Sequence, residues 1–501
     1  MLDSGSNPTP TWWTRGGWFL PAFVAVIILR FRFLTSPITS DEGGYFGAAR
    51  AWARGATLYE DVWVDRPQGL LLLYRLLHHL GLGNPVGIRL LALVVCLIGA
   101  AGCGYAARRL FGPGAAWPAA LAAGVFSSLP HAEGFIANSE LLSCGFSALG
   151  LALLLHGYWE RERPLHWALA AGGFFGAFAI TVKQSGFDAF FAGVFMLVIV
   201  CLGRRWPVRQ RIAAIASAVA GFAVPMILMV IHAAATGWSR WWYAFAGYRT
   251  DQRSALRNAD WRNLLESGGA VGPSLLPGLI IILAVAIRYL RRDERRAAAL
   301  MVVWMVFALL AFLLGGQFFR HYWVIFMFPI GAAVGAAVSL VPAGRMRHLL
   351  LAAALVVPVG YTIRAMALSE ERMGPVLSGD LRLVRTENVA RWFRDNREPD
   401  ENIYAMCASA ALYANVPTDP PYPYLWFALI PQVPGAHDQL IELFEGDDAP
   451  TYVARFQSAQ LCDPSGVIGR SLLRRYRTIG NIDGMVIYAR SDRALADDEL
   501  G

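Results

Sequence analysis

The chain has 501 residues, of which 56% are hydrophobic and only 16% are charged, and its formal net charge is +8 at pH 7. Soluble domains carry about 25% charged residues, so this composition excludes an ordinary soluble protein. The positive charge does not indicate nucleic-acid binding, because residues 1–366 hold 31 basic and 16 acidic residues whereas residues 367–501 hold 13 and 20. We interpret this asymmetry as a signal of membrane topology.

Apolar runs of roughly 17–22 residues, the length that crosses a hydrocarbon core, follow one another as far as residue 367. Eleven such runs predict eleven transmembrane helices, at residues 17–34, 86–106, 113–130, 140–158, 165–182, 186–203, 211–234, 272–290, 297–315, 322–341 and 348–366. The first run is long, lacks a small-residue cleavage site and precedes further spans, so we expect no cleavable signal peptide. From residue 368 such runs stop, which predicts a membrane part over residues 1–367 and a soluble domain over 368–501.

Alternate short loops are rich in arginine: Arg108 and Arg109; Arg161 and Arg163; Arg204, Arg205, Arg209 and Arg211; Arg291, Arg292, Arg295 and Arg296; Arg345 and Arg347. Cytoplasmic loops carry such an excess, so these loops and Arg15 predict one cytoplasmic side. The N-terminus is then cytoplasmic and the C-terminal domain extracytoplasmic, in a multi-pass protein of the cell membrane.

The first predicted outer loop, residues 35–85, gathers five carboxylates within 25 residues: Asp41, Glu42, Glu60, Asp61 and Asp65. A helical stretch from Tyr45 to Trp52 and a second from Leu70 to Leu80, which is too short to span, predict helices along the membrane interface. A later outer loop, residues 235–270, is rich in Trp and Tyr, as in an interfacial belt.

The C-terminal domain is predicted to be α/β. It shows an amphipathic helix near residues 381–396 and strand-like runs at Asn402–Ala405, Thr451–Phe456 and Met485–Ala489. Cys407 and Cys462 both fall in this outer domain, where a disulfide between them is compatible with an oxidising compartment. The other cysteines, Cys96, Cys103, Cys144 and Cys201, lie in apolar runs and are expected to be buried thiols.

Several polar residues beside the spans are candidates for chemistry. Asp41 and Glu42 form either a solvated turn or a carboxylate pair that deprotonates an acceptor hydroxyl, with Gly43 and Gly44 leaving room for substrate. Glu140 begins the fourth span, with Glu133 one loop earlier, and either compensates a helix dipole or is functional at membrane depth.

Lys183 is the sole lysine beside 43 arginines, and suits either a phosphate contact or a snorkelling span end. The segment Arg320-His321-Tyr322 either belongs to an interfacial belt of side chains or forms a binding site for phosphate, a metal or sugar hydroxyls. The sequence contains no HExxH, P-loop, GxGxxG or GxSxG motif.

These residues resemble a known group, the polytopic GT-C glycosyltransferases that use polyprenyl-phosphate sugars. The sequence is similar to bacterial members of the dolichyl-phosphate-mannose–protein mannosyltransferase family and to the lipid A aminoarabinose transferases. The matching segments are residues 41–45, 58–61, 65–70, 138–140, 183–184 and 316–322. The family commonly has Lys-Pro-Pro where this chain has Arg66, Pro67 and Gln68, so the charge is kept but the local turn can differ.

The resemblance implies an inverting transfer of a sugar from a polyprenyl-phosphate donor to an acceptor hydroxyl on a glycan, lipid or protein. It places the base at Asp41, with Glu42 and Glu140 as further catalytic candidates. In the alternative for Glu42, this residue orients a neighbouring group instead. Arg66, Lys183 and Arg320 are candidates for the donor phosphate. The remaining candidates for substrate contacts are Tyr45, Tyr59, Asp65, Glu133, His321 and Tyr322. A divalent metal is left open, because the His321 region varies in the family. A lipid or sugar transporter and a non-catalytic scaffold are the alternatives.

Overall fold

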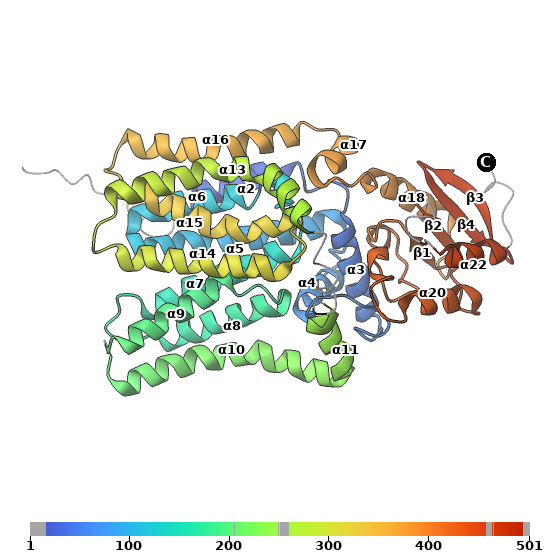
Figure 1. Cartoon of the computed structure of the whole chain (residues 1–501), viewed down its shortest axis with the longest axis horizontal. Helices are drawn as coiled ribbons and strands as arrows, with labels where there is room; N and C mark the ends of the chain where they lie inside the picture. Colours follow the sequence, from blue (N-terminus) through green and yellow to red (C-terminus); the bar gives the residue numbers. More distant parts are fainter. Residues whose placement is uncertain are drawn as a thin grey trace, which may run out of the picture.

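The structure, a computed structural model, describes residues 17–204, 206–248, 250, 260–456, 463 and 465–493. A bundle of long helices forms one end of the molecule and a small domain with a β-sheet forms the other (Figure 1). Two short helices, α3 (Ser40–Ala53) and α4 (Gln68–His79), lie between them. We call the part from residue 368 onward the C-terminal domain.

Each of the eleven predicted spans coincides with a helix of the bundle. These helices are α2 (Leu20–Phe31), α5 (Pro85–Phe111), α6 (Ala116–Phe126), α7 (Ser139–Tyr158), α8 (His166–Val182), α9 (Asp188–Leu202), α10 (Val208–Thr236), α13 (Asp260–Tyr289), α14 (Arg295–Gly315), α15 (Val324–Leu340) and α16 (Arg345–Met366). By length and composition, seven described helices can cross a membrane, and α2, α8 and α9 are shorter apolar helices. The predicted third span is interrupted, because a 3₁₀ turn, η2 (Pro113–Ala115), precedes α6 and shortens it to 11 residues.

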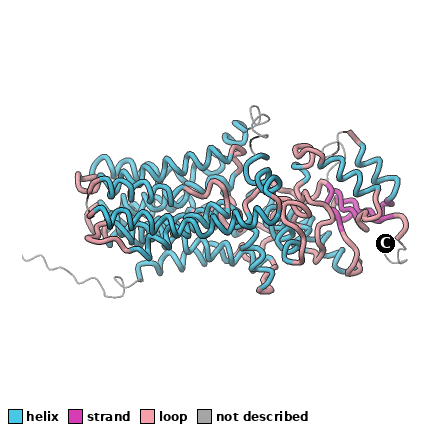
Figure 2. Tube along the Cα trace, turned by 90° about the horizontal axis from the view of Figure 1, so that it is seen from below, coloured by secondary structure: helices cyan, strands magenta, loops and turns pink. Residues whose placement is uncertain are grey.

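Small residues let the bundle helices approach one another closely. A Cβ added to Gly331 or Gly335 of α15 would overlap the backbone of Ala123 or Ala119 in α6. Such contacts between small residues are typical of helices that associate within a membrane. The long helices run side by side in both views of the chain (Figures 1 and 2).

The C-terminal domain contains α17 (Glu370–Met373), α18 (Leu383–Asn396), α19 (Leu412–Asn415), α20 (Ala436–Glu445) and α22 (Val467–Arg475). Its four strands, β1 (Ile403–Met406), β2 (Tyr452–Arg455), β3 (Tyr476–Ile482) and β4 (Met485–Arg490), form a sheet of order β1-β2-β4-β3. β1 pairs in parallel with β2, and the other two pairings are antiparallel. The mixed sheet confirms the α/β prediction, and β3 is the strand that the sequence did not indicate.

The C-terminal domain packs directly against α3, which corrects one prediction. A Cβ on Gly43 would overlap Cα of Ala411 and lie 2.9 Å from the carbonyl oxygen of Ala410, and a Cβ on Gly44 would overlap the Trp426 ring. The two glycines therefore make room for the C-terminal domain and not for a substrate.

The cysteines are as expected where the structure describes them. Cys96, Cys103, Cys144 and Cys201 are free and buried, and Cys407 is disulfide-bonded. The predicted pairing with Cys462 falls on a residue outside the described part of the chain.

Candidate active site

A cavity of about 750 Å³ lies where the bundle, α3 and the C-terminal domain meet. Eight of the predicted site residues line it: Asp41, Tyr45, Asp65, Arg66, Glu133, Arg320, His321 and Tyr322. They come from α3, the loop before α4, the turn before α7 and a 3₁₀ turn before α15, η5 (Arg320–Trp323). Four segments distant in the sequence thus supply one polar wall.

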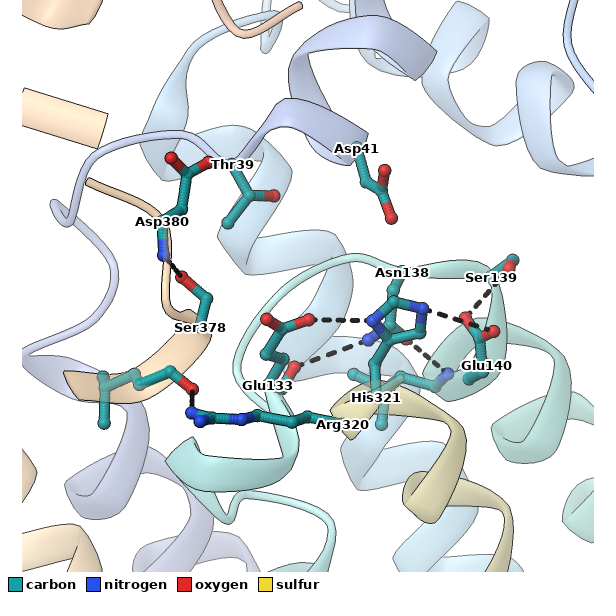
Figure 3. A network of polar contacts seen from close by, with 12 residues as sticks. Thr39, Asp41, Glu133, Asn138, Ser139, Glu140, Arg320, His321, Ser378 and Asp380 are labelled. Atoms are coloured by element: carbon teal, nitrogen blue, oxygen red, sulfur yellow. Dashed lines mark hydrogen bonds and ion pairs between the residues drawn. The ribbon is translucent and has the colours of Figure 1, made fainter. Parts of the chain in front are cut away.

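Asp41 is held at the wall of the cavity by the start of α3. Thr39 caps this helix: its hydroxyl accepts a hydrogen bond from the amide of Glu42, whose carboxylate accepts one from the Thr39 amide in return. This reciprocal cap fixes the first helical turn. Asp41 Oδ1 accepts a hydrogen bond of 3.1 Å from the indole Nε1 of Trp426, and Figure 3 shows the carboxylate projecting from α3 on the side of Glu133 and His321.

Burial raises the pKa of the Asp41 carboxyl above its ordinary value, because the charged form loses hydration. The positive charges of His321 and Arg66 lower this pKa, and the negative charges of Glu133 and Glu140 raise it again. The outcome is a carboxyl that takes up a proton more readily than a solvated aspartate does, which suits a general base.

Arg66 is a buried cation that faces the cavity. Its side chain forms an ion pair of 2.6 Å with Asp65 Oδ2, and its Nε donates a hydrogen bond of 3.3 Å to Ser139 Oγ. Burial lowers the pKa of Arg66, but Asp65 and other neighbours raise it, and the outcome is a pKa well above the ordinary value. The guanidinium therefore remains charged.

A network of charged groups connects residues of the cavity wall to buried residues behind them (Figure 3). His321 Nδ1 is 2.8 Å from Glu133 Oε2, and His321 Nε2 is 3.8 Å from Glu140 Oε1. Glu140 also forms an ion pair with Lys183 and accepts a hydrogen bond of 2.9 Å from Ser139 Oγ. The Lys183 ammonium lies 4.2 Å from the centre of the Tyr322 ring. Glu140 and Lys183 thus share a network with residues of the cavity but do not line it.

Glu42 occupies a different environment from Asp41 although the two are adjacent. Its carboxylate forms an ion pair of 3.0 Å with Arg89 and accepts hydrogen bonds from the amide of Ala137 at 3.0 Å and the hydroxyl of Thr39 at 2.9 Å. The residue is 0% exposed. These contacts fix α3 to α5 and to the turn before α7, so the predicted catalytic place of Glu42 does not fit its surroundings.

The two remaining predicted contacts also have structural partners. The hydroxyl of Tyr59 donates a hydrogen bond of 3.0 Å to the carbonyl oxygen of Arg66 and does not line the cavity. Arg320 lines it, but its guanidinium donates to the carbonyl oxygens of Val376 and Leu377 at 3.3 and 2.5 Å. Arg320 thereby connects η5, the turn before α15, to the π-helical turn η6 (Gly374–Ser378).

Sequence reasoning missed the wall that the C-terminal domain contributes. Trp426, Gln432, Asp380 and Arg382 all line the cavity. The sequence around these residues has no paired carboxylates or other motif like the one at Asp41 and Glu42, so nothing in it predicted a site. Among the described residues, no group of three or more His, Cys, Asp or Glu side chains is arranged to hold a metal ion.

Comparison with known proteins identifies the fold. No protein-family model matches the chain, and no match to a curated protein was found. ArnT from Cupriavidus metallidurans, solved with bound undecaprenyl phosphate, matches 97% of this chain and 100% of its own with a TM-score of 0.66 and 13% identity. The oligosaccharyltransferase AglB from Archaeoglobus fulgidus, solved with an inhibitory peptide and a dolichol-phosphate, matches 97% of this chain and 76% of its own, with a TM-score of 0.51 and 12% identity. The chain therefore shares its fold, the GT-C fold, with these two structures.

Proposed function

We propose that this protein transfers a sugar from a polyprenyl-phosphate donor to an acceptor hydroxyl at the outer face of the membrane, with inversion at the anomeric carbon. The observation that carries the proposal is the position of Asp41, a half-buried carboxylate at the wall of a polar cavity that also contains the buried cation Arg66. The likeness to two structures that contain polyprenyl phosphates supports the choice of donor.

In the proposed step, the acceptor oxygen attacks the anomeric carbon while its proton passes to Asp41. The bond between that carbon and the phosphate oxygen breaks, and the polyprenyl phosphate leaves with the electron pair. A fixed cation stabilises the negative charge that develops on this leaving group. We assign this task to Arg66, because it lines the cavity and remains charged.

We propose that Lys183 and Glu140, which do not line the cavity, hold the residues that do line it in position. Their ion pair is almost completely buried, with 6% and 1% of the side chains exposed. Ser139 links Glu140 to Arg66, since its hydroxyl donates to Glu140 and accepts from Arg66. The pair therefore orients the groups around the donor phosphate, and a direct contact of Lys183 with that phosphate is the alternative to test.

Transfer of radiolabelled pentoses and hexoses from polyprenyl-phosphate carriers, measured in proteoliposomes, tests the proposal. We expect Asp41→Asn to lower turnover by about 10²–10⁴-fold with donor binding retained, because Asn cannot accept the proton. Asp61→Asn is the matched control, because Asp61 is exposed in the same loop and accepts a hydrogen bond from the amide of Thr57. Movement of the intact lipid across the bilayer without sugar transfer would instead support a flippase.

The same assay gives a pH dependence with a defined sign. Catalysis needs ionised Asp41, whose pKa is raised, so turnover should fall as the pH is lowered through a value above that of an ordinary aspartate. Arg66→Gln removes a positive charge that lowers this pKa, so the acidic limb should move to still higher pH. An acidic limb that stays in place in Arg66→Gln would contradict the electrostatic coupling.

A further inference from the structure

The C-terminal domain reaches the candidate base through a single side chain. The indole N–H of Trp426 donates a hydrogen bond of 3.1 Å to Asp41 Oδ1, across 385 residues of sequence. Within the described ranges of the chain, this is the one hydrogen bond that the Asp41 carboxylate receives. The second carboxylate oxygen is thus left to accept a proton from a molecule in the cavity.

The Trp426 ring is itself fixed on α3. It packs against Gly44 so closely that a Cβ at that position would overlap the ring. It also lies against the Tyr45 ring, with centroids 5.5 Å apart and planes at 52°. The segment just before Trp426 is bound to the loop that precedes α4. The amide of Trp63 donates a hydrogen bond of 3.0 Å to the carbonyl oxygen of Pro423, and Trp63 pairs with Tyr424 in an isolated β-bridge.

A second group of contacts fixes the whole domain on the same helix. Arg50 of α3 is 4% exposed, and its guanidinium donates to the carbonyl oxygens of Val416, at 3.2 Å, and Thr418. It also forms an ion pair of 3.3 Å with Asp419. The amide of Ala410 donates 3.3 Å to the hydroxyl of Ser40, the residue before Asp41. The distance between Trp426 and Asp41 is therefore set by a packed interface.

A donor fixed in this way affects a carboxylate in two respects. It holds one oxygen, which restricts the side-chain rotation that would otherwise vary the position of the other oxygen. It also favours the ionised form, because a hydrogen bond to a carboxylate is stronger than one to a neutral acid.

We propose that Trp426 is a positioning residue for Asp41, and that the C-terminal domain thereby supplies part of the catalytic geometry. This inference rests on the proposed role of Asp41 as general base. Trp426 does not act on the substrate in this proposal; it holds Oδ1 so that the second oxygen of Asp41 is directed at the acceptor hydroxyl.

Trp426→Phe tests the proposal, because phenylalanine retains a ring against Gly44 and Tyr45 but lacks the N–H group. We expect kcat to fall about tenfold, as for the loss of one hydrogen bond to a charged group, with an unchanged KM for the donor. The acidic limb of the kcat profile should also move to higher pH. Trp392→Phe is the matched control, because Trp392 lies in α18 of the same domain and packs against Phe393 and Tyr452.

Two further measurements separate the outcomes. In an Asp41→Asn background, Trp426→Phe should cause no additional loss, because the group that it positions is already gone. A pH profile of Trp426→Phe that matches wild type, or an equal extra loss in the Asp41→Asn background, overturns the inference. If the wild-type protein transfers no sugar from any polyprenyl-phosphate carrier, the proposed function itself fails.

Thermal unfolding of both Trp→Phe variants shows whether Trp426→Phe is folded. If it is unfolded, Trp426→Tyr replaces it, and the same shift of the acidic limb is expected.

Discussion

Asp41 and Glu42 are adjacent carboxylates with opposite environments. Successive residues of a helix point about 100° apart, so neighbours in the first turn of α3 face different partners. Asp41 faces the cavity and Trp426, whereas Glu42 faces Arg89 and the amide of Ala137. The sequence left a solvated turn or a functional carboxylate pair open, and the spatial partners now separate a candidate base from a structural anchor.

Lys183 gives the clearest stability prediction at the level of single residues. The sequence left a phosphate contact or a snorkelling span end open for this residue, but its buried ion pair with Glu140 indicates that it also stabilises the fold. Removal of one partner from a buried pair leaves an uncompensated charge and typically costs about 3–5 kcal/mol. We therefore expect Lys183→Met to lower the melting temperature clearly in detergent, and Lys183→Met with Glu140→Gln to recover most of the loss.

The double variant also addresses the role of Lys183 in donor binding. If it regains stability but not donor binding, the ammonium acts on the donor phosphate directly. If it regains both, Lys183 serves to compensate Glu140. A Lys183→Met protein that melts like wild type would contradict the stabilising role of the pair.

Helix α3 is the element that connects the parts of the site. Its first turn carries Asp41, it packs on α4, Glu42 pairs with Arg89 of the bundle, and its glycines meet the C-terminal domain. A helix with three glycines at Gly43, Gly44 and Gly47 is intrinsically weak. The glycines are nevertheless required by close packing, because a residue with a Cβ would overlap Ala411, Trp426 or Tyr413.

This packing predicts the effect of Gly43→Ala. The added Cβ would overlap backbone atoms of Ala411, which cannot move aside as a flexible side chain can. Overpacking of this kind costs about 1–3 kcal/mol, so we expect a lower melting temperature, faster proteolysis between the C-terminal domain and the bundle, and reduced turnover. Gly360→Ala in α16 is the control, because its Cβ would meet no atom within 4 Å. Equal stability of the two variants would contradict the interface.

The strands of the C-terminal domain show which strands a local pattern of apolar residues can predict. β1, β2 and β4 were predicted because they are apolar, and the structure buries most of their residues. β3 was missed because only Tyr476 and Ile479 of its seven residues are buried, whereas β1, the other edge strand, is buried throughout. The position of β3 is decided by pairing with β4, which is not a local property.

At the level of the whole molecule, the contact between Asp41 and Trp426 requires α3 and the C-terminal domain to lie on the same side of the membrane. The arginine-rich loops predict that this side is extracytoplasmic. A reporter that is active only in the cytoplasm should be silent when fused after Gly501 and active when inserted in the loop at residues 291–296. A strong signal from the C-terminal fusion would reverse the predicted orientation.

The sequence by itself determined the helical membrane architecture, because a run of apolar residues long enough to cross a bilayer is a local property. It also indicated eight of the residues that line the cavity, through charged groups in unusual positions beside the spans. Only the tertiary structure decided what each group does. Glu42 meets an amide 95 residues away, Lys183 meets a carboxylate 43 residues away, and Asp41 meets an indole 385 residues away. These partners set charge, orientation and burial, and they are fixed by the packing of segments that no local pattern brings together.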